Sequence, residues 1–245
     1  MLKEVIRLSL FLVSKNSNED LIDILKRFGQ VVFLDVNPCL NKAESCHPDM
    51  QVFKTGNDSC IVAPGISIKV VEKLQSYGIS VLTGIDKLSV FYPDNIKYNV
   101  LKTDRHIIHN LKHTASDVLN YAEENSLDLI NVKQGYCACT SCYVEFCNLI
   151  ITGDPGIIKA AKDHNYNVCV FEHNNEIILE GYDHGFIGGC IVSLNKGKTL
   201  IFNGDIIRLY PDFVKRLESF GIEVFGVENA SLNDIGGVIC FLEQI

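Results

Sequence analysis

Four short loops of this chain carry an aspartate beside a turn-forming residue, and two of them also carry a histidine. The loops are His47-Pro48-Asp49, Tyr92-Pro93-Asp94, Tyr182-Asp183-His184 and Leu232-Asn233-Asp234. Carboxylates that gather at one place bind a cation such as a guanidinium or an amine, and a histidine beside them carries protons near pH 7. The alternative is structural, because aspartate and proline are also common turn formers. Equivalent positions in a repeated unit would favour the ligand-binding interpretation.

The elements that position these loops repeat along the chain. Residues 59–82 have the pattern of an apolar strand, a turn, an amphipathic helix and, after a Gly-Ile break, a second strand. The same order recurs in residues 6–35, 106–132, 148–172 and 198–227, and the last of these has its Gly-Ile break at Gly221-Ile222. The sequence therefore predicts five copies of one strand–helix–strand unit.

Each unit also needs an upstream strand that forms a hairpin with its first strand. Four such strands lie within the chain, at residues 50–54, 98–102, 139–145 and 186–194. The fifth can come only from the C-terminal run Val238–Leu242, which we expect to pair with the N-terminal run Val5–Val13. The expected fold class is α/β: five ββαβ units form a ring closed by that pairing, as a single domain over residues 1–245.

The composition excludes several classes of function. The 245 residues are 47% hydrophobic and 21% charged, as in globular proteins, and the formal net charge is −8. Nucleic acids and anionic membranes attract basic surfaces, so neither is an expected partner. Glu4 and Arg7 interrupt the N-terminal apolar run, which we interpret as a strand and not as a signal peptide, and no run reaches the ~20 apolar residues of a membrane span. Ten cysteines without a secretion signal predict a reduced, cytoplasmic protein.

The repeat resembles the pentein fold, the five-fold α/β propeller of guanidine-modifying enzymes such as arginine deiminase, agmatine deiminase and dimethylarginine dimethylaminohydrolase. The resemblance covers nearly the whole chain, and the strings HPDMQ, KQGY, GFIGG and LNDIGG resemble a clostridial-type branch of that superfamily. It implies that five loops meet at a central axis, the fifth being the one that contains Lys133. It also implies a hydrolase or amidinotransferase-like enzyme that acts on a small guanidino or amidine compound through a covalent cysteine adduct, without a cofactor or a metal.

The resemblance places the nucleophile at Cys240. Hydrolytic penteins carry this cysteine in the last unit after a Gly-Gly element, which Gly236 and Gly237 match here. Those enzymes often have a polar residue before the cysteine, whereas this chain has Ile239. The alternative is a buried strand cysteine that acts as a small hydrophobic residue.

His47 and Asp49 resemble the deiminase His-x-Asp element, and residues 180–183 resemble the Glu-Gly-x-Asp element that holds the guanidinium. Deiminases place the second element before their histidine, whereas here it follows His47. His184 is a second candidate proton carrier, and no arginine stands out as a clamp for the α-carboxylate of free arginine. The resemblance thus gives Cys240, His47 and His184 as catalytic residues, and Asp49, Asp183, Asp234, Glu180 and Lys133 as substrate-binding residues.

Two further motifs were interpreted as structural. The cysteines at 137, 139, 142 and 147 lie in an expected strand, where side chains alternate between faces, and no second Cys-x-x-Cys completes a tetrahedron. The glycine-rich run Gly185–Gly189 lacks the spacing of a nucleotide-binding loop. The alternative function is a non-catalytic pentein that binds a small cationic ligand or a protein partner.

Overall fold

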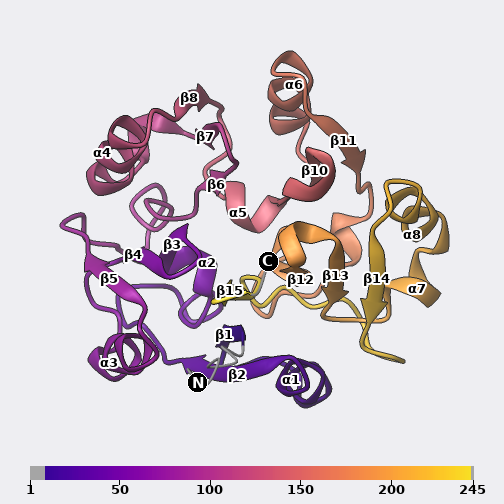
Figure 1. Ribbon diagram of the computed structural model, residues 1–245, viewed down its shortest axis with the longest axis horizontal. Coiled ribbons are helices and arrows are strands. Elements are labelled where there is room, and N and C mark those ends of the chain that lie inside the picture. The colour runs from indigo at the N-terminus through magenta and orange to yellow at the C-terminus, as the bar shows by residue number, and fades with distance from the viewer. Residues whose placement is uncertain (1–8, 244–245) are drawn as a thin grey trace, which may run out of the picture.

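The computed structural model describes residues 9–243, and its strands form five separate three-stranded sheets. Figure 1 shows the five sheets around a common centre, with the longer helices at the outside. In every sheet the middle strand is antiparallel to the innermost strand and parallel to the outermost one. The mixed α/β class and the five predicted repeats are therefore confirmed, and each described sheet is open.

The first three sheets follow the predicted order. The first contains β15 (Ile239–Phe241), β1 (Ser9–Ser14), α1 (Glu19–Lys26) and β2 (Gly29–Leu34). The second contains α2 (Pro48–Gln51), β3 (Val52–Gly56), β4 (Ser59–Val62), α3 (Ile68–Ser76) and β5 (Ser80–Thr83). The third contains β6 (Leu101–Lys102), β7 (His106–His109), η1 (Leu111–His113), α4 (Ser116–Glu124) and β8 (Asp128–Asn131).

The last two sheets carry additional short helical turns. The fourth contains α5 (Cys137–Thr140), β9 (Ser141–Val144), η2 (Glu145–Cys147), β10 (Leu149–Thr152), α6 (Pro155–Asp163) and β11 (Asn167–Val170). The fifth contains η3 (Asn174–Glu176), η4 (Gly188–Cys190), β12 (Ile191–Leu194), η5 (Asn195–Gly197), β13 (Thr199–Phe202), α7 (Ile206–Leu209), α8 (Pro211–Glu218) and β14 (Glu223–Gly226).

The C-terminal strand completes the N-terminal sheet, as predicted. Strand β15 pairs antiparallel with β1, with Leu10 opposite Phe241 and Leu12 opposite Ile239. The predicted partner began at Val5, and residues 5–8 lie outside the described part of the chain. Leu10 and Phe241 are fully buried in one hydrophobic cluster, so the two ends of the chain share a core.

Three of the predicted inner strands begin too early. A single helical turn precedes the strand in α2, α5 and η4, so that β3, β9 and β12 start two to five residues later than the apolar runs indicated. A short apolar run does not distinguish a strand from a buried turn of helix. The correction matters because these turns face the centre of the molecule (Figure 1), where the strand prediction had placed extended chain.

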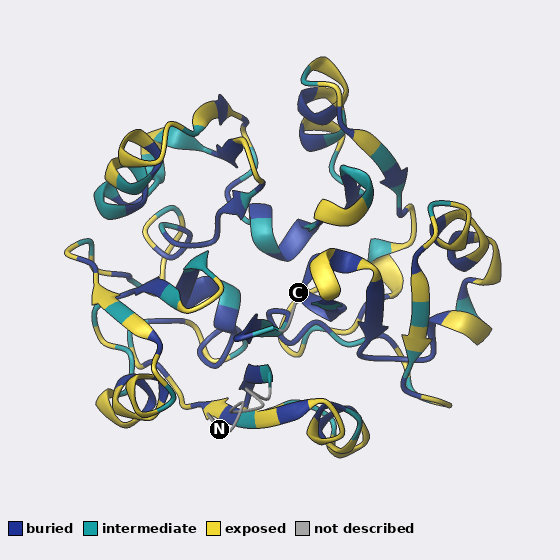
Figure 2. Cartoon of the chain, in the orientation of Figure 1, coloured by how far each residue is buried: buried dark blue, intermediate teal, exposed yellow. Residues whose placement is uncertain are grey.

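The outer helices form where the sequence is amphipathic and capped. Asn18 accepts a hydrogen bond from the backbone N–H of Asp20 at 2.8 Å, and Asp154 accepts one from Ile157 at 2.9 Å, so both helix starts have a side-chain cap. The helices bury one face against the sheets and leave the other exposed, whereas the inner strands are mostly buried (Figure 2). Within residues 9–243, no helix has both the length and the apolar character that crossing a membrane requires.

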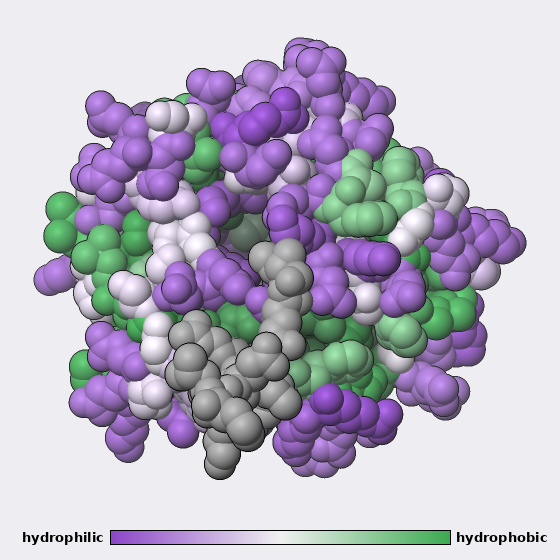
Figure 3. All heavy atoms as spheres, in the orientation of Figure 1, coloured by the Kyte–Doolittle hydropathy of each residue, from purple (hydrophilic) through white to green (hydrophobic). Residues whose placement is uncertain are grey.

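The inner strands of all five sheets line a central cavity of about 510 Å³. Each strand or its adjacent turn contributes lining residues, among them Lys54, Lys102, Tyr143, Ser193 and Cys240. Figure 3 shows a largely hydrophilic face with a hollow near its centre. The loops at the two ends of these strands are thereby brought near one axis.

Candidate active site

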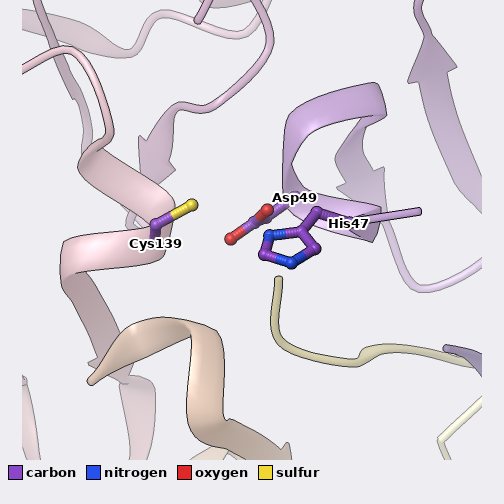
Figure 4. A group of neighbouring side chains, drawn as sticks. All are labelled: His47, Asp49 and Cys139. Carbon is purple, nitrogen blue, oxygen red and sulfur yellow. The ribbon is translucent and has the colours of Figure 1, made fainter. Parts of the chain in front are cut away.

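The structure brings a thiol, an imidazole and a carboxylate together near the centre of the molecule. Donor atoms of His47, Asp49 and Cys139 all lie within 4.8 Å of one another (Figure 4). In that view the sulfur of Cys139 points toward the carboxylate of Asp49, and the His47 ring lies beside it. These residue types support nucleophilic attack by sulfur with proton transfer by imidazole, and zinc also accepts all three as ligands.

Two helical turns from different sheets hold these residues. His47 is the N-cap residue of α2 and Asp49 lies in its first turn, while Cys139 lies in α5. Because an α-helix places residues two apart on different sides, Asp49 and His47 approach Cys139 from different directions.

Asn99 fixes the position of the sulfur. Its side-chain amide is fully buried and donates a hydrogen bond to the sulfur of Cys139 at 3.0 Å. Its carbonyl oxygen accepts from the backbone N–H of Ala138 at 2.9 Å and of Cys139 at 3.2 Å. One asparagine therefore holds both the backbone and the side chain of the α5 turn.

A second carboxylate supports His47 from the loop before β15. Asp234 is 3% exposed, and its Oδ1 lies 3.8 Å from Nδ1 of His47. It accepts hydrogen bonds at 2.9 Å from the backbone N–H groups of Phe186 and Gly236. Burial raises the pKa of the Asp234 carboxyl, while His47 and these N–H groups act to lower it.

The glycines of the strings GFIGG and LNDIGG allow this close packing. A Cβ at Gly189 would lie 1.8 Å from Oδ1 of Asp234, and one at Gly236 would lie 2.3 Å from Cβ of His47. Gly236 also has a φ of +73°, which glycine adopts without strain. The two strings are thus part of the site, and their role is to admit the side chains of Asp234 and His47.

Asp49 is the most unusual ionisable group of the site. Its two carboxylate oxygens are buried and have no hydrogen-bond partner among the described residues. Burial raises its pKa to about 6, with Asp234 adding to the effect and His47 opposing it. An unpartnered buried carboxylate is costly unless a cation or a donor reaches it.

Cys139 is a buried thiol in an acidic environment. Burial raises the pKa of Cys139 well above the ordinary thiol value, and the negative charges of Asp49 and Asp234 raise it further. In the empty site the sulfur is therefore protonated, since both the lack of water and the nearby carboxylates disfavour a thiolate.

A pocket of about 200 Å³ opens over these residues. Its lining residues are Glu44, His47, Tyr136, Cys139, Leu179, Tyr182, Asp183, His184, Phe186 and Asp234. A larger cavity of about 800 Å³ adjoins it and shares His47, Leu179, Tyr182 and Asp234. His47 and Asp234 therefore stand between two compartments, and Cys139 lines only the smaller one.

Several predicted site residues come together here. His47 and Asp234 are buried in the wall of the pocket, and Asp49 lies next to them. His184 and Asp183 line the pocket at its rim, where Asp183 is exposed.

Other predicted residues lie elsewhere. Cys240 on β15 is 4% exposed and lines the central cavity, and it is not among the described residues of the pocket that contains His47 and His184. Glu180 is exposed at the mouth of the larger cavity, 3.7 Å from Lys42. Lys133 and Asp94 are exposed and line none of these three cavities, so the expected convergence of all five loops is incorrect for these two.

The sequence argument missed Cys139 as the partner of His47. It assigned residues 139–145 to a strand, in which Cys137 and Cys139 would share one face, but both lie in the helical turn α5. A usable signal was the position of Cys139 immediately after the Lys133 loop, equivalent to that of Asp49 after His47. Glu44 and Asn99 belong to no motif that the repeat analysis could detect.

The comparison with family models assigns the chain to a family. Its sequence matches the model described as "Family of unknown function (DUF6873)" over residues 12–239. The chain belongs to this family. No curated protein matches the sequence.

Solved structures share the fold at low sequence identity. An inosamine-phosphate amidinotransferase from Streptomyces griseus has a TM-score of 0.56 and 11% identity, and the match covers 89% of this chain and 76% of that one. An amidinotransferase from Microseira wollei in the saxitoxin biosynthetic pathway has a TM-score of 0.56 and 13% identity over 92% and 89% of the two chains. The agmatine deiminase of C. jejuni has a TM-score of 0.55 and 11% identity over 98% and 94%. The predicted resemblance to the pentein fold is thereby confirmed.

Proposed function

We propose that this member of the DUF6873 family is a pentein enzyme that acts on a small guanidino or amidine compound, with Cys139 as the nucleophile. The observation that carries the proposal is the group of Cys139, His47 and Asp49 within 4.8 Å, beside a pocket with further carboxylates. The structural neighbours include amidinotransferases and a deiminase, which supports chemistry at a guanidino carbon. The sequence-based proposal for Cys240 receives no such support, since that sulfur lies apart from both candidate histidines.

Substrate binding activates the thiol in this proposal. The amidinium or guanidinium group binds against Asp49 and Asp234, where its positive charge replaces the missing counter-ion of the buried carboxylates. The same charge lowers the pKa of the Cys139 thiol, because a nearby cation stabilises the thiolate. The empty enzyme therefore keeps its nucleophile protonated, and the cation that it attacks also promotes its ionisation.

The chemical steps follow from the residues at hand. The S–H proton of Cys139 passes to the imidazole of His47, and the sulfur forms a bond to the amidino carbon. The bond from that carbon to the leaving nitrogen breaks, and the amine departs with the proton from His47. A water deprotonated by His47 then attacks the carbon, the C–S bond breaks, and the sulfur recovers a proton. An amine in place of water would complete an amidino transfer.

The fold supports the same proposal at the level of the whole chain. Five similar sheets, with β15 of one end paired to β1 of the other, are what a closed five-fold propeller requires. We include that closed ring in the proposal, together with a cationic small-molecule substrate and a cytoplasmic location.

A pair of variants tests the nucleophile. Cys139→Ala should abolish release of ammonia, urea or amine from a panel of guanidino and amidine compounds, whereas Cys240→Ala should retain most of it. A haloacetamidine, whose cationic head resembles the substrate, should alkylate Cys139 faster than neutral iodoacetamide does, as mapped by peptide mass spectrometry. Activity lost in Cys240→Ala and retained in Cys139→Ala would overturn the assignment. Ligand binding without turnover of any compound would favour the non-catalytic alternative.

A further inference from the structure

The pocket over Cys139 has an aromatic wall. The rings of Tyr92, Tyr136 and Phe186 stack in succession, with centroids 6.1 Å and 6.3 Å apart and planes inclined by 30° and 29°. His184 contacts Phe186 edge to face at 5.6 Å. Tyr136 and Phe186 line the pocket and are half-buried, while Tyr92 is exposed at the outer end. A row of ring faces therefore runs from the surface to the compartment that contains the sulfur.

The hydroxyl groups near this wall are committed to one buried carboxylate. Asn95 donates to Oη of Tyr136 at 2.7 Å and to Glu44 at 3.1 Å, and Tyr182 donates to Glu44 at 2.9 Å. These bonds fix the orientation of the Tyr136 and Tyr182 side chains and leave ring faces free to contact a ligand. Glu44 is 4% exposed and receives these hydrogen bonds from uncharged donors only.

The charge of the pocket selects against a carboxylate. Its lining includes Glu44, Asp183 and Asp234, and among the described residues no lysine or arginine lines it. A carboxylate brought into this compartment would be buried without a basic partner, which is costly. Lys15 and Lys42 line only the adjoining larger cavity, where both are exposed.

We infer that the ligand of this pocket is a monocationic amidine or guanidine that has a flat apolar body and no carboxylate. Its cation faces Asp234 and Glu44 beside Cys139, and its body lies along Tyr136 and Phe186. Aromatic contact and the burial of apolar surface supply affinity on that side, and the acidic groups supply it on the other. The inference rests on the proposed function for its site, and it adds that free arginine is a poor ligand.

Binding to the unreactive Cys139→Ala protein tests the inference without catalysis. By calorimetry, benzamidine should bind at least about tenfold more tightly than acetamidine, which has the same cationic head without the ring. 4-Carboxybenzamidine and arginine should bind at least about tenfold more weakly than benzamidine, because each brings an unpaired carboxylate. Equal affinities for benzamidine and acetamidine, or tightest binding of arginine, would overturn the inference.

Variants locate the contact on the wall. Phe186→Leu in the same background should reduce the preference for benzamidine over acetamidine several-fold, whereas Phe186→Tyr, which keeps the ring, should retain it. Phe225→Leu, at a phenylalanine that is 48% exposed on β14, is the matched control and should have no effect. Melting temperatures report whether each variant is folded, and the Phe186→Tyr result stands if Phe186→Leu does not fold. A preference for benzamidine that Phe186→Leu leaves intact would overturn the placement.

The two proposals fail separately. Preferential benzamidine binding in a protein that turns over no guanidino compound would contradict the enzymatic proposal and leave the ligand class standing. Turnover of arginine that depends on Cys139, and on Lys15 or Lys42, would do the reverse.

Discussion

At the scale of single residues, the site consists of carboxylates held where their charge is unfavourable until a cation arrives. Asp49 has no hydrogen-bond partner among the described residues, and Asp234 lies 3.8 Å from the only imidazole nearby. Such groups are stable when protonated or when paired with a ligand cation. Their ionisation should therefore be visible in binding.

The affinity for cationic ligands should depend on pH through Asp49. Its pKa is raised to about 6, so Asp49 is neutral below that pH and attracts a cation only above it. The affinity of benzamidine, which is cationic throughout this range, should rise as the pH increases through about 6 and then level off. In Asp49→Asn that rise should be absent, as measured by calorimetry between pH 5 and 8. A wild-type affinity that does not change with pH would contradict the assignment.

His109 should make the fold sensitive to acid. It is fully buried, with its ring nitrogens 2.7 Å from Oγ1 of Thr114 and 2.8 Å from the carbonyl oxygen of Gly135, and burial lowers its pKa to about 4. The unfolded chain takes up a proton near the ordinary value of ~6.5, so this contribution is full above pH 6.5 and is lost as the pH falls toward 4. The loss is of order 3 kcal/mol.

The test is urea unfolding at pH 7.5 and pH 4.5. His109→Gln should lose stability at pH 7.5 and show a smaller drop between the two pH values than the wild type. His173→Gln, at an exposed histidine, is the control and should keep the wild-type drop. An identical drop in His109→Gln and the wild type would exclude His109 as its source.

At the scale of elements, the helical turns α2, α5 and η4 determine where the chemistry lies. Each turn precedes an inner strand, and the first two carry Asp49 and Cys139. The turn η4 carries Gly188 and Gly189, which pack against the backbone of Cys139 and the carboxylate of Asp234. The three turns therefore act together, and crowding in one should displace residues held by the others.

Gly189→Ala should disrupt the site through η4. The added Cβ would meet Oδ1 of Asp234 at 1.8 Å, so the carboxylate must move and the contact with His47 must change. We expect a stability loss of about 1–3 kcal/mol and loss of benzamidine binding. Gly156→Ala, the same substitution in α6, where no neighbour is closer than 3.1 Å, should leave both properties near the wild-type values. Unchanged binding in Gly189→Ala would show that Asp234 tolerates displacement.

The sequence predicted the repeats better than it predicted these turns. Strand–helix–strand units were recognisable because helix periodicity and the Gly-Ile breaks extend over many residues, and the pairing of Val238–Leu242 with the N-terminal run followed from counting strands. The turns α2 and α5 are only four residues long, too short for a period to be detected. His47, Asp49 and Asp234 were selected correctly as neighbours, whereas Cys139 was not, since its proximity to His47 depends on the turn that was missed.

At the scale of the whole molecule, the pairing of β15 with β1 joins the two ends of the chain in one core. Phe241 is fully buried there, in a cluster that contains residues of β1, β2, β3 and β4. Truncation of this side chain leaves a cavity shared by two sheets.

Phe241→Ala should destabilise the whole domain by about 3–5 kcal/mol, the range for removal of a buried phenylalanine ring. Phe225→Ala, at a phenylalanine that is 48% exposed, removes the same atoms and should cost little. Urea unfolding with two probes, tyrosine fluorescence and far-ultraviolet circular dichroism, should give coincident transitions in both variants. A Phe241→Ala transition in which one probe precedes the other would show that the terminal sheet melts alone.

The pairing of β15 with β1 also constrains the order of events during synthesis. Leu10 is among the first residues to leave the ribosome and its partner Phe241 among the last, so the first sheet cannot be completed while the chain is still growing. Until then one edge of β1, an apolar strand, has no neighbouring strand, and such an edge can pair with another chain. The other four sheets have all their strands within consecutive stretches and can form in turn. A nascent chain stalled before residue 239 would therefore be the species most in need of a chaperone, and the first sheet would be the last to become protected from proteolysis.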